Sequence, residues 1–170
     1  MPIIKPYKGN IPDVSGASFI AENATLVGRV VLGANANVWY GVVLRGDVGF
    51  IRIGASTNIQ DLACIHATLG MSNTEIGAEV TVGHGAIIHG ATIRDGALIG
   101  MGSVILDNAE IGEECLVAAG TVVTPRTIIP PRSLVRGQPG KVIRPLRDDE
   151  WPMGRLSAAH YVELSAEHRV

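Results

Sequence analysis

The stretch that decides the fold runs from Ile76 to Val135 and reads IGAEVTVGHGAIIHGATIRDGALIGMGSVILDNAEIGEECLVAAGTVVTPRTIIPPRSLV. Aliphatic residues recur at every sixth position of it, with one five-residue step, at Ile76, Val82, Ile88, Ile93, Ile99, Ile105, Ile111, Val117, Val123, Ile129 and Val135. A helix repeats every 3.6 residues and a strand every 2, so neither explains this spacing over such a length. Hexapeptide repetition is typical of a parallel β-helix.

The same spacing extends toward the N-terminus, with one slip of three residues, through Val14, Ile20, Leu26, Leu32, Val38, Leu44, Phe50, Ile53, Ile59 and Ile65. Many of these residues are followed by glycine or another small residue, which lets the backbone turn a corner. The pattern predicts a triangular prism of short strands with the aliphatic side chains inside. Because three hexapeptides make one coil, about seven coils span residues 14–135.

The C-terminal segment has a different character. We expect the β-helix domain, with an N-terminal lead-in, to occupy residues 1–145, and residues 146–170 to contain a helix that packs on it. Pro152 and Gly154 would disrupt an early start. The helix is therefore expected at about 156–168, facing the prism with a stripe of Leu156, Ala159, Val162 and Ala166.

Composition excludes several partners and compartments. The formal net charge is −2 and there is no run of Lys or Arg, so nucleic acid and anionic membranes are not expected as partners. The N-terminus lacks a secretory-signal pattern, and no apolar run approaches the roughly 18 residues of a membrane span. Cys64 and Cys115 lack CxxC spacing and are expected to be two buried thiols. These features favour a soluble, cytoplasmic protein.

Two interruptions of the repeat flank three histidines, His66, His84 and His89. His66 precedes the polar loop 67–75, and the five-residue step lies beside His89. His66 and His84 are 18 residues apart, so we expect them to stack on one face about 4.8 Å apart. Three neutral histidines and a water form a catalytic zinc site. Since a prism is convex, a neighbouring subunit would complete the convergence; three unrelated surface histidines are the alternative.

Two polar clusters lie upstream of these histidines. Arg45 and Asp47 are spaced to point the same way on a strand, and with Asp61 they can form ion pairs within or between subunits. Asn58 and Gln60 likewise share a face. Amide side chains beside a metal site can orient its water or hydroxide toward an electrophile. Ordinary surface polarity is the alternative for both clusters.

Together these segments resemble the gamma-class carbonic anhydrase family: WYGVVLRGD (39–47), NIQD (58–61), His66 and HGAIIH (84–89). The resemblance implies a homotrimer of left-handed β-helices with zinc, ferrous iron or cobalt sites at the subunit interfaces. It implies His66 and His89 of one chain and His84 of its neighbour as ligands. The implied reaction is the reversible hydration of carbon dioxide to bicarbonate through a metal-bound hydroxide.

The resemblance also implies roles for the polar clusters. Arg45 and Asp47 would hold the interface through an ion pair and help place bicarbonate, with Asp61 supporting Arg45. Gln60, together with Asn58, would orient the metal-bound hydroxide.

The loop after the first histidine departs from the family prototype. The prototype has an acidic loop with a glutamate proton shuttle, whereas residues 67–74 contain no acid. Proton export would then fall to buffer, Glu75 or Tyr161. The short loop resembles a second subclass, in which hydration activity is often weak.

Two other functions remain open at this point. Many hexapeptide-repeat proteins act on acyl-CoA, so the chain could be an acyl-CoA thioesterase or an acyltransferase. A transferase would need one catalytic histidine and no metal, which three histidines argue against, whereas a metal-dependent thioesterase fits them. The third alternative is a non-catalytic homologue that binds metal.

Overall fold

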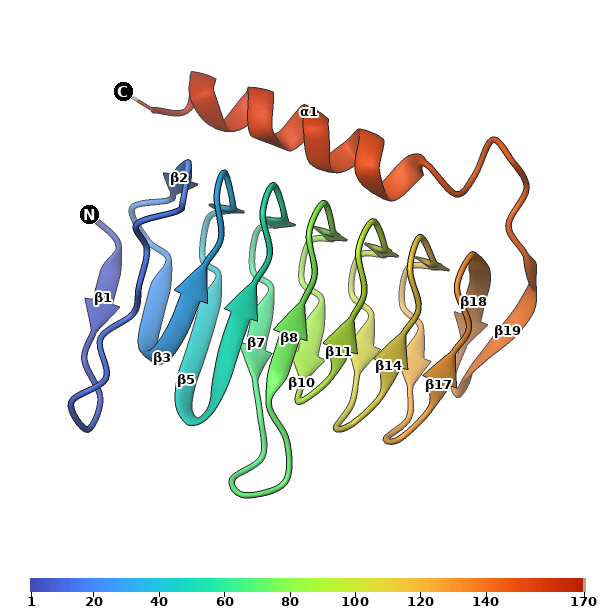
Figure 1. Ribbon diagram of the computed structural model, residues 1–170, viewed down its shortest axis with the longest axis horizontal. Helices are drawn as coiled ribbons and strands as arrows, with labels where there is room; N and C mark the ends of the chain where they lie inside the picture. The colour runs from blue at the N-terminus through green and yellow to red at the C-terminus, as the bar shows by residue number, and fades with distance from the viewer. Residues whose placement is uncertain (170) are drawn as a thin grey trace.

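The computed structural model describes residues 1–169, which form a parallel β-helix with one long helix along its side (Figure 1). The helix is α1 (Met153–Glu167), and the strands are β1 (Ile3–Lys5), β2 (Phe19–Ile20), β3 (Thr25–Leu32), β4 (Asn37–Val38), β5 (Val43–Ile53), β6 (Asn58–Ile59), β7 (Cys64–His66), β8 (Thr74–Ile76), β9 (Thr81–Val82), β10 (Ile87–His89), β11 (Thr92–Ile93), β12 (Leu98–Ile99), β13 (Val104–Ile105), β14 (Glu110–Ile111), β15 (Leu116–Val117), β16 (Val122–Val123), β17 (Ile128–Ile129), β18 (Ser133–Gly137) and β19 (Gly140–Pro145).

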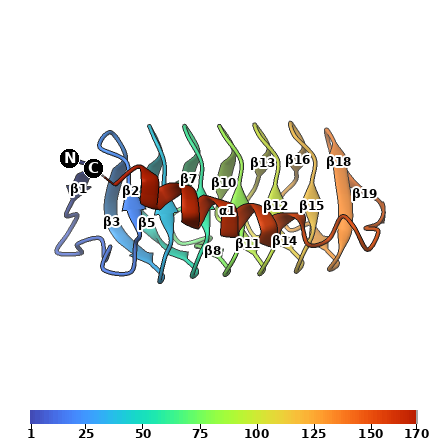
Figure 2. The same ribbon diagram turned by 90° about the horizontal axis from the view of Figure 1, so that it is seen from above.

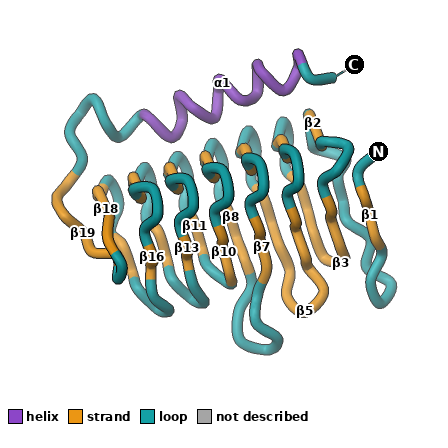
Figure 3. The backbone as a smooth tube through the Cα atoms, turned by 180° about the vertical axis from the view of Figure 1, so that it is seen from behind, coloured by secondary structure: helices purple, strands orange, loops and turns teal. Residues whose placement is uncertain are grey.

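The strands build three faces, and Figure 3 shows the stacked coils from behind. Face I contains β7, β10, β13 and β16, and face II contains β8, β11, β14 and β17. The long strands β3 and β5 bend from face I into face II and so join both in one sheet. Face III is a separate sheet, in which β2, β4, β6, β9, β12, β15 and β18 each mark one coil. An antiparallel strand, β19, closes its end.

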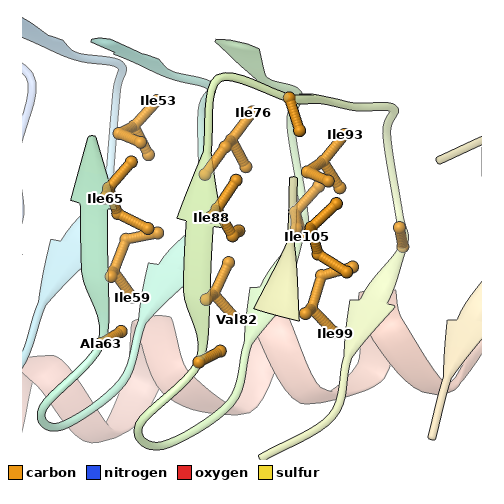
Figure 4. Packing of buried hydrophobic residues seen from close by; sticks show 14 of the residues in the cluster. Ile53, Ile59, Ala63, Ile65, Ile76, Val82, Ile88, Ile93, Ile99 and Ile105 are labelled. Carbon is orange, nitrogen blue, oxygen red and sulfur yellow. The ribbon is translucent and has the colours of Figure 1, made fainter. Parts of the chain in front are cut away.

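The core is a column of aliphatic side chains. Each coil places one from each face into the interior, as Ile53, Ile59 and Ile65 do in Figure 4. Every repeat position from Ile76 to Val135 is buried. The predicted parallel β-helix is therefore confirmed. The six-residue spacing explains the fold, because it places one inward side chain on each of the three faces in turn.

One inward position was predicted wrongly. Phe50 is only half-buried and lies under the Arg52 guanidinium, whose carbon is 4.4 Å from the ring centroid. Ile51 takes the inward position instead. The reason is that β5 runs unbroken through the corner, and its pairing with β3 shifts register between Gly28 and Val30.

The C-terminal helix begins earlier and faces differently than predicted. It starts at Met153, directly after Pro152, because a proline at a helix start loses no hydrogen bond. The expected stripe is wrong, since Leu156 is 65% exposed. Small residues face the prism instead, namely Gly154, Ala158 and Ser165. They let the helix lie close against β4, β6, β9 and β12, along the row of coils seen in Figure 2.

Replacing Ala158 with leucine is expected to lower the free energy of unfolding by about 1–3 kcal/mol, because this side chain is fully buried and a larger one overpacks the contact. Ala159→Leu, at the exposed next position, is the matched control and should change stability little. Thermal unfolding and protease cleavage of the linker before α1 measure the effect. Equal behaviour of the two variants would contradict this packing.

The outward surfaces of the faces differ. On face I, one row of stacked outward residues is apolar: Val43, Cys64, Ile87, Val104 and Val122. Face II instead carries ion pairs, such as Arg52 with Glu75. Cys64 in the apolar row is exposed, so the prediction of two buried thiols holds only for Cys115. Within residues 1–169, no helix has the length and apolar character needed to cross a membrane.

Candidate metal centre

The predicted site residues gather at two corners of the prism. We call Arg45, Asp47, His66 and His89, with Asp107, the paired-histidine cluster; it lies where face I meets face II. The His84 cluster lies where face III meets face I and consists of Asn58, Gln60, Asp61 and His84.

The expected stacking of His66 on His84 is wrong. His66 pairs in register with His89, 23 residues later, and His84 lies beside Asp61, again 23 residues away. The loop between β7 and β8, which protrudes from the prism in Figure 1, adds five residues to this coil. An 18-residue spacing across the loop therefore no longer marks neighbours.

Hydrogen bonds fix the proton positions on the paired histidines. Asp47 lies 3.0 Å from Nε2 of His66, and Asp107 lies 3.2 Å from Nδ1 of His89. Because a carboxylate only accepts, each of these nitrogens carries the proton. Burial by itself raises the pKa of Asp47, but hydrogen bonds from Arg45 and His66 outweigh it, so the pKa lies below its ordinary value.

The remaining nitrogens of the pair are suited to a cation. Nδ1 of His66 and Nε2 of His89 then both present lone pairs, and they face each other at 3.2 Å. Two nitrogens bound to a tetrahedral zinc at about 2.0–2.1 Å stand about 3.3 Å apart. Arg45 Nη2 lies 3.3 Å from the same Nδ1, and because a guanidinium only donates, this contact also requires that Nδ1 is the unprotonated nitrogen. The donor pair therefore fits zinc.

The His84 cluster offers a third nitrogen. Nδ1 of His84 lies 2.8 Å from Asp61, so the proton is on Nδ1 and Nε2 is left unprotonated on a side chain that is 45% exposed. Within one chain, Asp61 contacts His84, while Arg45 pairs with Asp47 at 2.8 Å.

A chain of hydrogen bonds orients the Gln60 amide. The Thr81 hydroxyl donates to the Gly154 carbonyl at the start of α1, and it accepts from the Asn58 amide. Asn58 Oδ1 in turn accepts from Gln60 Nε2 at 3.0 Å. Because the Gln60 amide nitrogen is held by Asn58, the side-chain carbonyl oxygen Oε1 is the atom that this buried residue can present to a ligand.

Each of the three predicted ligands thus has its own aspartate. A metal-binding histidine nearly always donates its second ring nitrogen to a carboxylate, carbonyl or water, which sets its tautomer and orientation. Neither of the other two histidines has such a carboxylate among the described residues: His168 bonds to the Tyr40 hydroxyl, and His160 lies exposed on α1.

One chain by itself does not assemble three ligands. Among residues 1–169, no group of three or more His, Cys, Asp or Glu side chains is placed to hold a metal ion. The pair and His84 stand at different corners of the prism.

The structure shows the positions of Glu75 and Tyr161, the two residues named as candidates for carrying the proton away. Glu75 points outward on face II, where it pairs with Arg52 at 3.4 Å, away from the histidines. Tyr161 on α1 packs edge-on against Trp39, with the ring centroids 5.2 Å apart. Its burial, and then the negative charge of Asp61, raise the pKa of the Tyr161 hydroxyl.

Sequence reasoning missed Asp107. This carboxylate accepts from His89 and from the Ser72 hydroxyl. A usable signal was present, because Asp107 follows His89 by 18 residues, one uninterrupted coil.

Comparison with known proteins gives consistent matches. The family model described as "Bacterial transferase hexapeptide (six repeats)" matches residues 90–125. A protein of Geobacillus kaustophilus named "Carbonic anhydrase" is 45% identical, over 95% of this chain and 88% of its own. "Gamma carbonic anhydrase 2, mitochondrial" of Arabidopsis thaliana is 41% identical over 92% of this chain. The match spans 58% of that longer relative.

A solved structure from Bacillus cereus, described as a putative acetyltransferase, superposes with a TM-score of 0.94. It is 39% identical, and the match covers 98% of this chain and 96% of that one.

Proposed function

Because the chain belongs to the gamma carbonic anhydrase family, we propose that it catalyses the reversible hydration of carbon dioxide to bicarbonate at a zinc site shared between subunits. One observation carries the proposal: His66, His84 and His89 are each held by an aspartate that leaves the other ring nitrogen unprotonated and able to bind a metal. Ferrous iron and cobalt also suit imidazole ligands.

The surface supports a homotrimer. Face II is charged and α1 covers part of face III, whereas face I exposes its apolar row between the two histidine-bearing corners. In a ring of three, one corner of a subunit meets the other corner of the next. The His84 cluster of one subunit would then adjoin the paired-histidine cluster of its neighbour.

Each residue around this shared site has a separate role in the proposed reaction. Zinc, when bound, acts as a Lewis acid that lowers the pKa of a water to about 7. The Gln60 carbonyl, held by Asn58, accepts a hydrogen bond from the attacking water and so orients it. Arg45, kept in place by Asp47, offers a positive charge to the bicarbonate product.

Mixing two inactive variants tests the shared site. His84→Ala and His89→Ala proteins should each bind little zinc and show little hydration in stopped-flow assays. Refolded together, they should recover about a quarter of the wild-type zinc content and activity, because a random ring places an intact pair beside an intact His84 at that share of its interfaces.

The control is each variant refolded alone. If the mixture stays as empty as its components, the site is not shared. If the mixture binds zinc yet the wild type hydrates no carbon dioxide, the reaction is wrong although the metal centre is right.

Hydrolysis of an acyl-CoA thioester is the second candidate. The putative acetyltransferase relative favours it, as does a largely apolar groove of about 310 Å³ that Gln60 lines together with Leu98, Leu116 and Met153. The same zinc chemistry can attack a thioester. A panel of acyl-CoA substrates assayed beside carbon dioxide separates the two functions.

Free thiols at Cys64 and Cys115 favour the reducing cytoplasm as the compartment.

A further inference from the structure

Asp107 stands between the paired histidines and the loop 67–73. It lies in the turn between β13 and β14, at the corner that also holds His89. Its Oδ2 accepts from Nδ1 of His89 at 3.2 Å, and its Oδ1 accepts from the hydroxyl of Ser72 at 2.5 Å. The carboxylate therefore binds a histidine with one oxygen and the loop with the other.

The loop end of this connection is built into the structure. The Ser72 side chain is buried, and its oxygen also accepts the backbone N–H of Thr68 at 3.0 Å. Ser72 thus closes the turn of the loop with the same oxygen that contacts Asp107. Its neighbour Asn73 fastens the loop to β5 by accepting the backbone N–H of Phe50 at 2.9 Å.

Gly90 makes room for both partners. A Cβ at this position would collide with the Ser72 hydroxyl and with Oδ1 of Asp107, and its φ of +65° is one that side chains disfavour. The five-residue step beside His89 therefore has a physical explanation. It makes a short corner at Gly90, and the missing side chain there lets Ser72 and Asp107 come into contact.

We infer that Asp107 is a positioning residue that fixes the tautomer of His89 and ties the loop 67–73 to this histidine. The inference rests on the proposed zinc site. With its proton held on Nδ1 by Asp107, His89 keeps Nε2 free and aimed at Nδ1 of His66. The loop is anchored to the same carboxylate, so loss of Asp107 should both loosen the loop and release the orientation of His89.

Asp107→Asn tests the inference, with Asp95→Asn as the matched control. Asp95 occupies the corresponding kind of turn but accepts the Ala78 backbone N–H and contacts no histidine. The zinc dissociation constant, measured by competition with a chelator, should rise about 10- to 100-fold in Asp107→Asn and stay unchanged in Asp95→Asn. Equal affinities in the two variants would overturn the inference.

Two further measurements separate positioning from general damage. In metal-free protein, nitrogen NMR of the imidazole should find the His89 proton on Nδ1 in the wild type. In Asp107→Asn it should find a mixture of the two neutral tautomers, with the proton on Nδ1 in some molecules and on Nε2 in others. Ser72→Ala should loosen only the loop, with faster hydrogen exchange there and nearly unchanged zinc affinity. A wild type that binds no zinc would overturn the proposed function, while the NMR comparison would still decide the role of Asp107.

Discussion

Replacing His84 with alanine is expected to weaken zinc binding by more than the 10- to 100-fold typical of losing a residue that only supports a ligand, because a ligand itself is removed. The protein should still fold as the wild type does. His84 is an outward side chain at a corner, with its imidazole 45% exposed, and it takes no part in the aliphatic core. Metal analysis and circular dichroism measure the two outcomes.

His160→Ala is the matched control for His84→Ala. His160 is an exposed histidine on α1 that has no carboxylate partner among residues 1–169, so its loss should leave the zinc content unchanged. Full zinc occupancy in His84→Ala would remove this histidine from the site. Loss of zinc together with loss of folded structure would show that the corner stabilises the coil.

Replacing Ile99 with alanine is expected to lower the free energy of unfolding by about 2–5 kcal/mol. Ile99 is fully buried in a central coil, between Val82 of the coil before and Val117 of the coil after. A prism this narrow has few ways to fill the cavity, and each coil is supported only by its two neighbours. Urea unfolding at a fixed protein concentration measures the loss.

Leu98→Ala controls for this change, because the two residues are adjacent on β12 and point to opposite sides. Leu98 is half-buried on the outer surface of face III, so its truncation should cost much less. Similar costs at the two positions would mean that the inside and outside of the coil are not distinguished by burial as described.

The sequence alone predicts the architecture because the repeat acts locally. Each inward residue, such as Ile105 or Ile111, occupies a position that depends only on the six-residue step before it. Phe50 is the exception, since β5 passes through its corner without the usual turn. The three histidines could be singled out because two interruptions of the step flank them, the loop after His66 and the five-residue step beside His89.

The sequence did not predict which residues lie side by side on the two coils that the loop 67–73 separates. The loop after His66 lengthens one coil, so Asp61 takes the place beside His84 that a uniform count gives to His66. The helix itself was predicted, but its contact face was not, for a different reason. Its contact face uses Gly154 and Ala158, whose value is their small size, while hydropathy favoured the larger Leu156, which is exposed.

With the proposed site shared between subunits, the separation of the two histidine clusters on one chain would make zinc binding depend on protein concentration. A ligand that binds only the associated form stabilises it in proportion to the logarithm of the free ligand concentration. Zinc held between His89 of one subunit and His84 of the next would be such a ligand. Dilution and chelation should therefore reinforce each other, so that stripping the ion loosens the ring and dissociating the ring releases the ion.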